Sequence, residues 1–139
     1  MKNIKIFAKA YQATTEDIRV SVQPFYLEDE SDPEEGHFFW AYQVQIENLG
    51  VDPVRLKSRY WRITDSHGHT EEVRGEGVVG EQPLIEPGYA FEYTSGAPLG
   101  TASGFMKGSY RMRRHDGTSF EVEIPHFSLD SPHGSSMVN

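Results

Sequence analysis

Apolar and polar side chains alternate along much of this chain, most clearly in the run HFFWAYQVQIEN. The odd positions of this run include glutamine and glutamate. The even positions carry large apolar side chains: Phe38, Trp40, Tyr42, Val44 and Ile46. A period of two sends successive side chains to opposite faces of a strand. The run therefore predicts a strand with one buried face.

Six more segments predict strands, and the helical period is not sustained anywhere. They are Ile18–Tyr26, Val54–Asp65, Thr70–Arg74, Tyr89–Ser95, Gly104–His115 and Thr118–Pro125. The last two flank Asp116–Gly117, a pair typical of two-residue type I′ hairpin turns. About seven short strands joined by turns predict an all-β protein, an antiparallel β-sandwich of immunoglobulin or fibronectin type III character. A small barrel is the alternative architecture.

The length of 139 residues predicts one domain over residues 1–139. The polar, small residues at its end predict a flexible tail over residues 130–139. The chain has no cysteine, which excludes disulfides, thiol catalysis and cysteine-ligated zinc. The N-terminal run MKNIKIFAKAYQ lacks the apolar centre of a signal peptide, and no apolar stretch is long enough to span a membrane. We expect a cytoplasmic protein.

Charge is unevenly distributed on this chain. The net charge of −8 argues against general nucleic-acid binding, which depends on neutralising phosphates. Six acidic residues lie between Glu28 and Glu35 and predict a solvated loop, although such a cluster could hold divalent cations weakly. On strands, one basic set would share one face (Arg55, Lys57, Arg59), as would a second set (Lys107, Arg111, Arg113). If the two strands share a sheet, these residues form a basic panel, either a solvated face or a surface for an anion or an acidic partner.

The string GEGVVG matches the G-x-G-x-x-G phosphate-binding pattern at Gly75, Gly77 and Gly80. A dinucleotide site needs a helix that begins at the last glycine, and Pro83 and Pro87 argue against one. Two interpretations remain. The glycines can form a loop that needs positive φ angles or close packing. Alternatively, the loop amides form a nest for phosphate, pyrophosphate or a nucleotide, with charge supplied by Arg74.

Other candidate chemistry is sparse. Asp65, His67 and His69 lie in a DSHGH segment that reads as a turn, with a divalent-metal site as the alternative. No G-x-S-x-G nucleophile elbow is present, so we expect no enzymatic activity and no cofactor. Phe39 falls on the polar face of its strand. It is either an anchor for a partner or packed beneath the acidic loop or the N-terminus.

Several runs resemble the ApaG family, also called CorD: WAYQVQIEN, LKSRYWRITDSHG, FEVEIPHFSL and the long segment that contains GEGVVGEQPLIEPG. The resemblance covers residues 11–129, which it implies are the core of the domain, and it implies a fibronectin type III-like sandwich. The family's glycine motif falls on Gly75, Gly77 and Gly80. Bacterial members are associated with cobalt resistance and magnesium efflux. Related domains in eukaryotic F-box proteins and in a polymerase-δ-interacting protein resemble protein-interaction modules.

Three functions follow as hypotheses. The first is a non-enzymatic module that binds a protein partner through sheet faces or exposed edges. The second is a sensor of pyrophosphate or nucleotide polyphosphates that uses Arg74 and the glycine loop. The third is direct binding of a divalent cation. Exposed sandwich edges would also permit a homodimer, and we expect no membrane association.

Overall fold

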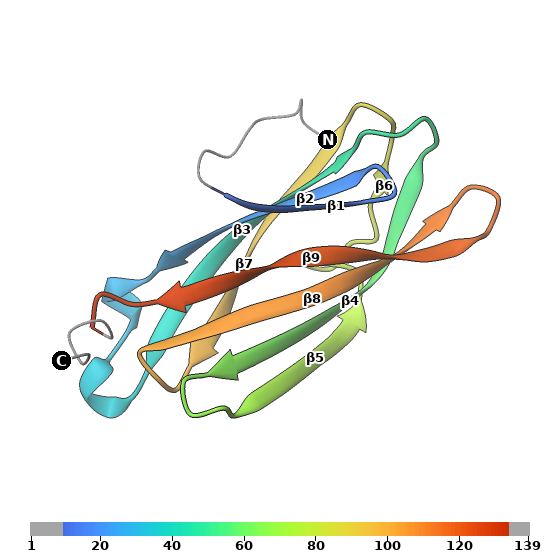
Figure 1. Cartoon of the computed structure of the whole chain (residues 1–139). Coiled ribbons are helices and arrows are strands. Elements are labelled where there is room, and N and C mark those ends of the chain that lie inside the picture. Colours follow the sequence, from blue (N-terminus) through green and yellow to red (C-terminus); the bar gives the residue numbers. More distant parts are fainter. Residues whose placement is uncertain (1–9, 134–139) are drawn as a thin grey trace.

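The computed structural model describes residues 10–133, and these form nine strands in two stacked antiparallel sheets (Figure 1). The first sheet has the order β1 (Tyr11–Thr15), β2 (Ile18–Tyr26), β3 (Phe38–Asn48) and β7 (Ala90–Leu99). The second has the order β5 (Thr70–Glu76), β4 (Val54–Asp65), β8 (Ser103–Arg114) and β9 (Ser119–Asp130), and β6 (Leu84–Ile85) also pairs with β4.

The predicted β-sandwich is confirmed, and each of the seven predicted strands is present. β2 and β4 have the predicted bounds, while β9 runs five residues beyond the predicted Pro125. β1 and β6 were not predicted. Each is short, with five and two residues, so neither carries enough alternation to stand out in the sequence.

The core lies between the two inner faces and is rich in aromatic side chains. The ring of Tyr42 on β3 packs 5.0 Å from that of Trp61 on β4, and Trp61 meets Phe127 on β9 edge to face at 5.9 Å. The apolar residues on alternate positions of β2, β3, β8 and β9 are almost fully buried. Burial of this apolar surface is the main force that holds the two sheets together.

The hairpin turns differ from the prediction in one respect. The type I′ turn expected at Asp116–Gly117 is wrong: Gly117 has a φ of 92°, but Asp116 does not adopt positive φ. The Arg114 amide donates to Thr118 O at 2.8 Å, which makes a three-residue loop with Gly117 in its last position. Two-residue turns with both φ angles positive occur at Glu16–Asp17 and at Val79–Gly80.

The ends of the described region and the acidic segment complete the fold. Glu28–Gly36 contains two short 3₁₀ turns, η1 (Glu28–Glu30) and η2 (Pro33–Glu35), whose side chains are not buried. Ser131 is buried and donates its amide to Ala102 O at 3.0 Å, so the ordered fold continues past residue 130. Residues 1–9, for which no signal peptide was predicted, lie outside the described residues. So do residues 134–139 of the predicted tail. Within residues 10–133, no helix is long and apolar enough to cross a membrane.

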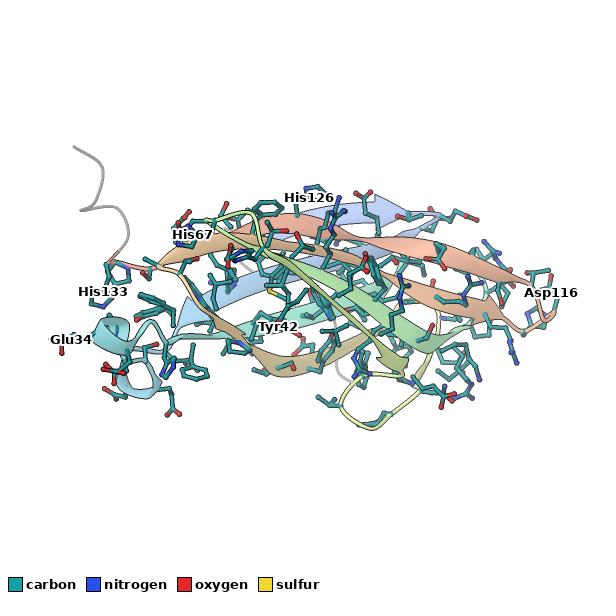
Figure 2. All side chains as sticks on the ribbon, turned by 90° about the horizontal axis from the view of Figure 1, so that it is seen from below. Glu34, Tyr42, His67, Asp116, His126 and His133 are labelled. Atoms are coloured by element: carbon teal, nitrogen blue, oxygen red, sulfur yellow. The ribbon has the colours of Figure 1, made fainter. Side chains whose placement is uncertain are left out.

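The two long sides of the sandwich differ. On one side β1 approaches β9: the Glu123 amide donates to Thr15 Oγ1 at 3.1 Å, and Tyr11 packs against Phe127. On the other side lie β5 and β7. Figure 2 views the molecule from below, and Tyr42 is labelled there between the sheets. There Val73 of β5 pairs with the buried Trp61, which places its side chain on the inner face, yet it is 39% exposed. β7 therefore leaves the inner face of β5 partly uncovered.

Candidate functional site

The glycine motif forms a small hairpin directly after β5. Val78 and Glu81 exchange two backbone hydrogen bonds, of 2.8 and 2.9 Å, around a turn made by Val79 and Gly80. The Gly77 amide donates to Lys57 O at 2.9 Å. Two amides of the predicted nest, those of Gly77 and Val78, thus already donate to carbonyl groups of the protein itself.

Gly77 and Gly80 have conformations that favour glycine. Their φ angles are 62° and 82°. A Cβ on residue 77 would lie 2.1 Å from Glu81 O, far inside contact distance, whereas a Cβ on residue 80 would meet open space. Positive φ at both residues and close packing at Gly77 account for these two glycines without a ligand. The structural interpretation of the motif explains this geometry, and anion binding by the loop stays a prediction.

Arg59 holds this hairpin from the inner face of the second sheet. Its Nη1 donates to Glu76 O and Gly77 O, both at 3.0 Å. The prediction that Arg59 shares a face with Arg55 is wrong, because a β-bulge between Leu56 and Ser58 shifts the register of β4 against β8. Such a bulge changes the face on which the following residues point. Arg59 consequently pairs with the fully buried Tyr110.

Beside Arg59 lies a cluster of buried tyrosines. The hydroxyls of Tyr93 on β7 and Tyr110 on β8 share a hydrogen bond between the sheets. Burial raises the pKa of both phenols well above their usual range, although the Arg59 charge acts to lower them. Burial also raises the pKa of Tyr42. These groups stay neutral and hydrogen-bonded at neutral pH, as structural tyrosines do.

The outer face of the second sheet carries the basic residues in a modified arrangement. β4 and β8 are neighbours, as the panel required, and Arg55 lies opposite Arg113. Arg62, which was not among the predicted panel residues, lies opposite Lys107 on this outer face. Acidic residues of the flanking strands border this panel: Glu72 and Glu76 on β5, and Glu121 and Glu123 on β9. One of them, Glu121, forms a 3.0 Å ion pair with Arg111, so the panel is partly neutralised.

A shallow depression lies on this outer face. Its lining includes Arg74 and Gly75 of the predicted anion site, and the other lining residues are Ser58, Arg59, Tyr60, Ser109, Arg111 and two carboxylates, Glu76 and Glu121. Gly77 and Gly80 are not part of its lining. The Arg74 guanidinium stacks over the Tyr60 ring at 4.4 Å, and the Tyr60 hydroxyl donates to Glu72 at 2.5 Å, a hydrogen bond that raises the tyrosine pKa. The structure therefore brings only part of the predicted anion set together.

The predicted metal ligands lie in a tight turn between β4 and β5. Asp65 Oδ1 accepts the amides of His67 and His69, both at 2.9 Å. Although desolvation acts to raise the pKa of Asp65, these hydrogen bonds hold it below its usual value. The two imidazole rings are 6.2 Å apart. In this conformation, residues 10–133 contain no group of three His, Asp or Glu side chains placed to hold a metal ion.

Exposed apolar side chains gather on the outer face of the first sheet. Phe25 is 44% and Phe39 37% exposed. Phe25 lies opposite Ala41 across the β2–β3 pair, and Phe39 lies opposite the exposed Pro98 across the β3–β7 pair. We call Phe25, Phe39, Ala41 and Pro98 the Phe25–Phe39 patch. Phe39 is therefore half-exposed beside the acidic segment rather than packed beneath it.

Phe25 was not predicted as a surface residue, although the sequence contained the signal. Val20 and Val22 mark the buried parity of β2, and residue 25 has the opposite parity, as Arg19 does. Alternation thus places an aromatic ring on a solvent face. Pro98 carried no comparable signal, since its position depends on the pairing of β7 with β3.

Comparison with known proteins identifies the family. The family model described as the ApaG domain matches residues 28–114. The chain belongs to the ApaG family. The Protein ApaG of Parvibaculum lavamentivorans is 57% identical over 129 residues, which are 93% of this chain and 99% of that protein. The Protein ApaG of Maricaulis maris is 65% identical over 115 residues, which are 83% of this chain and 88% of the relative.

Solved structures agree with this ApaG assignment. A crystal structure of a Bordetella pertussis protein described as an ApaA protein matches with a TM-score of 0.81 and 48% identity, covering 84% of this chain and 94% of that one. The C-terminal domain of wzt matches with a TM-score of 0.53 at 10% identity, over 90% of this chain and 79% of that one. The second likeness concerns the fold alone. The ApaG model begins in the acidic segment and ends with β8, so it includes the glycine hairpin and Phe39.

Proposed function

We propose that this ApaG chain is a non-enzymatic protein-interaction module that binds its partner through the Phe25–Phe39 patch. The observation that carries the proposal is the exposure of two phenylalanine rings on neighbouring strands of one sheet face. Aromatic side chains dominate binding energy when a partner removes them from water. A cluster of exposed apolar side chains indicates a binding surface, whereas single exposed apolar side chains are common on any protein.

The border of the patch indicates the kind of partner. The acidic segment that contains η1 and η2 adjoins it: Leu27 N–H donates to Phe39 O at 2.9 Å, and the Phe39 amide donates to Ser31 Oγ at 2.9 Å. Six acidic side chains in this segment give the patch a negative rim. A matching partner surface has an apolar centre and lysine or arginine around it, because complementary charge steers association.

The family association with cobalt resistance and magnesium efflux fits this proposal as an indirect effect. The module would act on cation homeostasis through the protein that it binds, and the cation itself would not contact Asp65, His67 or His69. Purified protein titrated with cobalt and magnesium tests this part. Binding that is lost in His67→Ala would support direct cation recognition instead.

Site-specific photo-crosslinking in cells tests the main proposal. A photo-reactive phenylalanine analogue is placed at residue 39, at residue 25, or at exposed Arg55 on the outer face of the other sheet as a control. We expect the same crosslinked protein from residues 39 and 25 and none of it from residue 55. Equal crosslinking from all three positions would refute a specific patch.

The alternative function is a sensor of phosphate, pyrophosphate or nucleotide polyphosphates. The depression that contains Arg74, Gly75 and Arg111 is the observation that favours it. Thermal unfolding with pyrophosphate and with ATP tests it, because a ligand at about a hundred times its Kd stabilises the native state by about 2.7 kcal/mol. A rise in Tm that disappears in Arg74→Ala and persists in Phe39→Ser would favour the sensor over the module.

A further inference from the structure

β7 has one paired edge and one free edge. The Asn48 amide donates to Tyr89 O at 3.0 Å, and antiparallel alternation then directs the odd residues of β7 toward β3. On the other side of β3, the Leu27 amide donates to Phe39 O. The backbone groups of the odd residues of β3 therefore point toward β2 and those of its even residues toward β7, which agrees with this pattern. The backbone groups of Glu92, Thr94 and Gly96 therefore point away from β3.

No strand among residues 10–133 pairs with this free edge. Thr94, Gly96 and Pro98 are exposed, and because glycine has no side chain, the exposure of Gly96 is exposure of the backbone. The strand reads AFEYTSGAPL: Glu92 is its one charged residue, and Pro98, a residue that discourages pairing, lies only near its end. By contrast, the neighbouring edge strand β5 has charged residues at Glu72, Arg74 and Glu76.

The free edge of β7 faces a part of the second sheet that no strand of the first sheet covers within residues 10–133. The hydroxyl of Tyr93 on β7 shares a hydrogen bond with that of Tyr110 on β8, so β7 lies over β8. Because β8 is separated from β5 by β4, β5 extends past the edge of β7. The side chain of Val73 on the inner face of β5 is 39% exposed for this reason. We call the space between the free edge of β7 and the inner face of β5 the β5–β7 groove.

The two ends of the β5–β7 groove differ in charge. At one end a cavity of about 230 Å³ is lined by Ile63, Asp65 and Glu71 on the second sheet, by His69 in the turn between β4 and β5, and by Pro98, Leu99 and Gly100 at the end of β7. At the other end Arg59 is paired with Gly75 of β5, and its guanidinium lies against Gly75 on the inner face of the second sheet. The groove therefore has an acidic end, an apolar middle at Val73 and a basic end.

We propose that the β5–β7 groove binds an extended segment of a partner protein by β-strand addition to β7. The inference rests on the proposed interaction function and adds a second contact surface, which joins the Phe25–Phe39 patch at Pro98. Main-chain hydrogen bonds to Glu92, Thr94 and Gly96 supply affinity, as in other strand-addition complexes. The segment carries an apolar side chain that packs on Val73 and a lysine or arginine that meets Glu71.

A second copy of this chain fits the groove less well. If two copies paired through β7, the second sheet of each copy would lie under the β7 strand of the other. That position is already taken by β5. A single extended segment requires only one strand of space. We therefore assign the groove to a segment of a different protein.

The probe is the best binder selected from a displayed library of linear peptides against the full chain. Its affinity is measured for wild type and for the variants Thr94→Pro, Thr94→Val and Phe39→Ser. Proline at residue 94 removes a donor of the free edge, so we expect affinity to fall at least about tenfold, the equivalent of about 1.4 kcal/mol. Thr94→Val keeps the amide and should bind normally. N-methylation of successive peptide residues should block binding at every second position.

Other results would overturn the inference. These are a library that yields no binder, binding that is insensitive to N-methylation, and a β7-mediated homodimer seen by light scattering. Loss of binding in Phe39→Ser but not in Thr94→Pro would also refute strand addition while leaving the patch, and with it the proposed function, intact. If Thr94→Pro does not fold, amide exchange in wild type decides. Glu92, Thr94 and Gly96 should exchange faster than Tyr93, Ser95 and Ala97 and slow down when peptide binds, and slow exchange without peptide would refute a free edge.

Discussion

The guanidinium of Arg59 occupies the space that a side chain at Gly75 would need. A Cβ on residue 75 would lie 2.8 Å from both terminal nitrogens of Arg59. The two residues are directly paired across β4 and β5. The first glycine of the motif therefore makes room for an arginine of the protein itself, and this arginine fastens the hairpin that follows.

This relationship predicts energetic coupling between the two residues. Gly75→Ala should destabilise wild type, because the Arg59 side chain must move and weaken its bonds to Glu76 O and Gly77 O. In an Arg59→Ala background the same substitution should cost less. Urea unfolding of the two single variants and the double variant measures the difference, and we expect a coupling of about 0.5 to 3 kcal/mol. Strict additivity would show that Arg59 does not constrain Gly75.

The second and third glycines of the motif should differ in their tolerance of alanine. Gly80→Ala faces only a positive φ angle and should cost about 1 kcal/mol. Gly77→Ala meets the Glu81 carbonyl as well and should cost more than about 2 kcal/mol. Chemical unfolding of both variants tests the order. Equal costs would contradict the packing described for Gly77.

Arg19 and Glu47 form an ion pair on the outer face of the first sheet, and removing one partner should destabilise the protein more than removing the other. Arg19 contacts both oxygens of Glu47, at 2.7 and 2.8 Å, and the Glu47 side chain is 1% exposed while that of Arg19 is 32% exposed. Arg19→Met strands a buried carboxylate and should cost about 3 kcal/mol. Glu47→Gln should cost less, because Arg19 can reach water. The reverse order in thermal unfolding would contradict this assignment.

Alkaline pH should destabilise the fold through the buried tyrosines. Their pKa values are raised in the folded state, so the folded protein holds these protons more tightly than the unfolded chain does. The stabilisation is complete below about pH 10, the usual pKa of tyrosine, and is lost as the pH rises above it. In a variant with Tyr93→Phe and Tyr110→Phe, stability should fall less steeply over this range. Identical pH profiles would exclude the two phenols as the cause.

The alternation of residues predicted the strands well because each buried face is set by local parity. Parity fails at a bulge, which is why Arg59 was placed outside: nothing in the string VRLKSRYW marks the irregularity between Leu56 and Ser58. The glycine motif shows a similar limit. Its spacing resembles a phosphate loop, but the role of Gly75 and Gly77 depends on Arg59 and Glu81, whose approach only the folded chain defines.

The Phe25–Phe39 patch was only partly predictable for the same reason. Phe39 stood out because an aromatic residue interrupted a polar face. The patch as a whole depends on the pairing of β2 and β7 with β3, which brings together residues from three separated segments. The depression at Arg74 depends likewise on the order of β5, β4 and β8.

The most direct test of the interaction account is the Kd of the protein crosslinked at residue 39, measured with purified components for wild type, Phe39→Ser and Arg74→Ala. Loss of an anchoring aromatic ring should weaken binding by at least about tenfold. Arg74→Ala lies on the other sheet and should bind as wild type does. Undiminished binding by Phe39→Ser, or loss of binding in Arg74→Ala alone, would contradict the assignment of the Phe25–Phe39 patch as the partner surface.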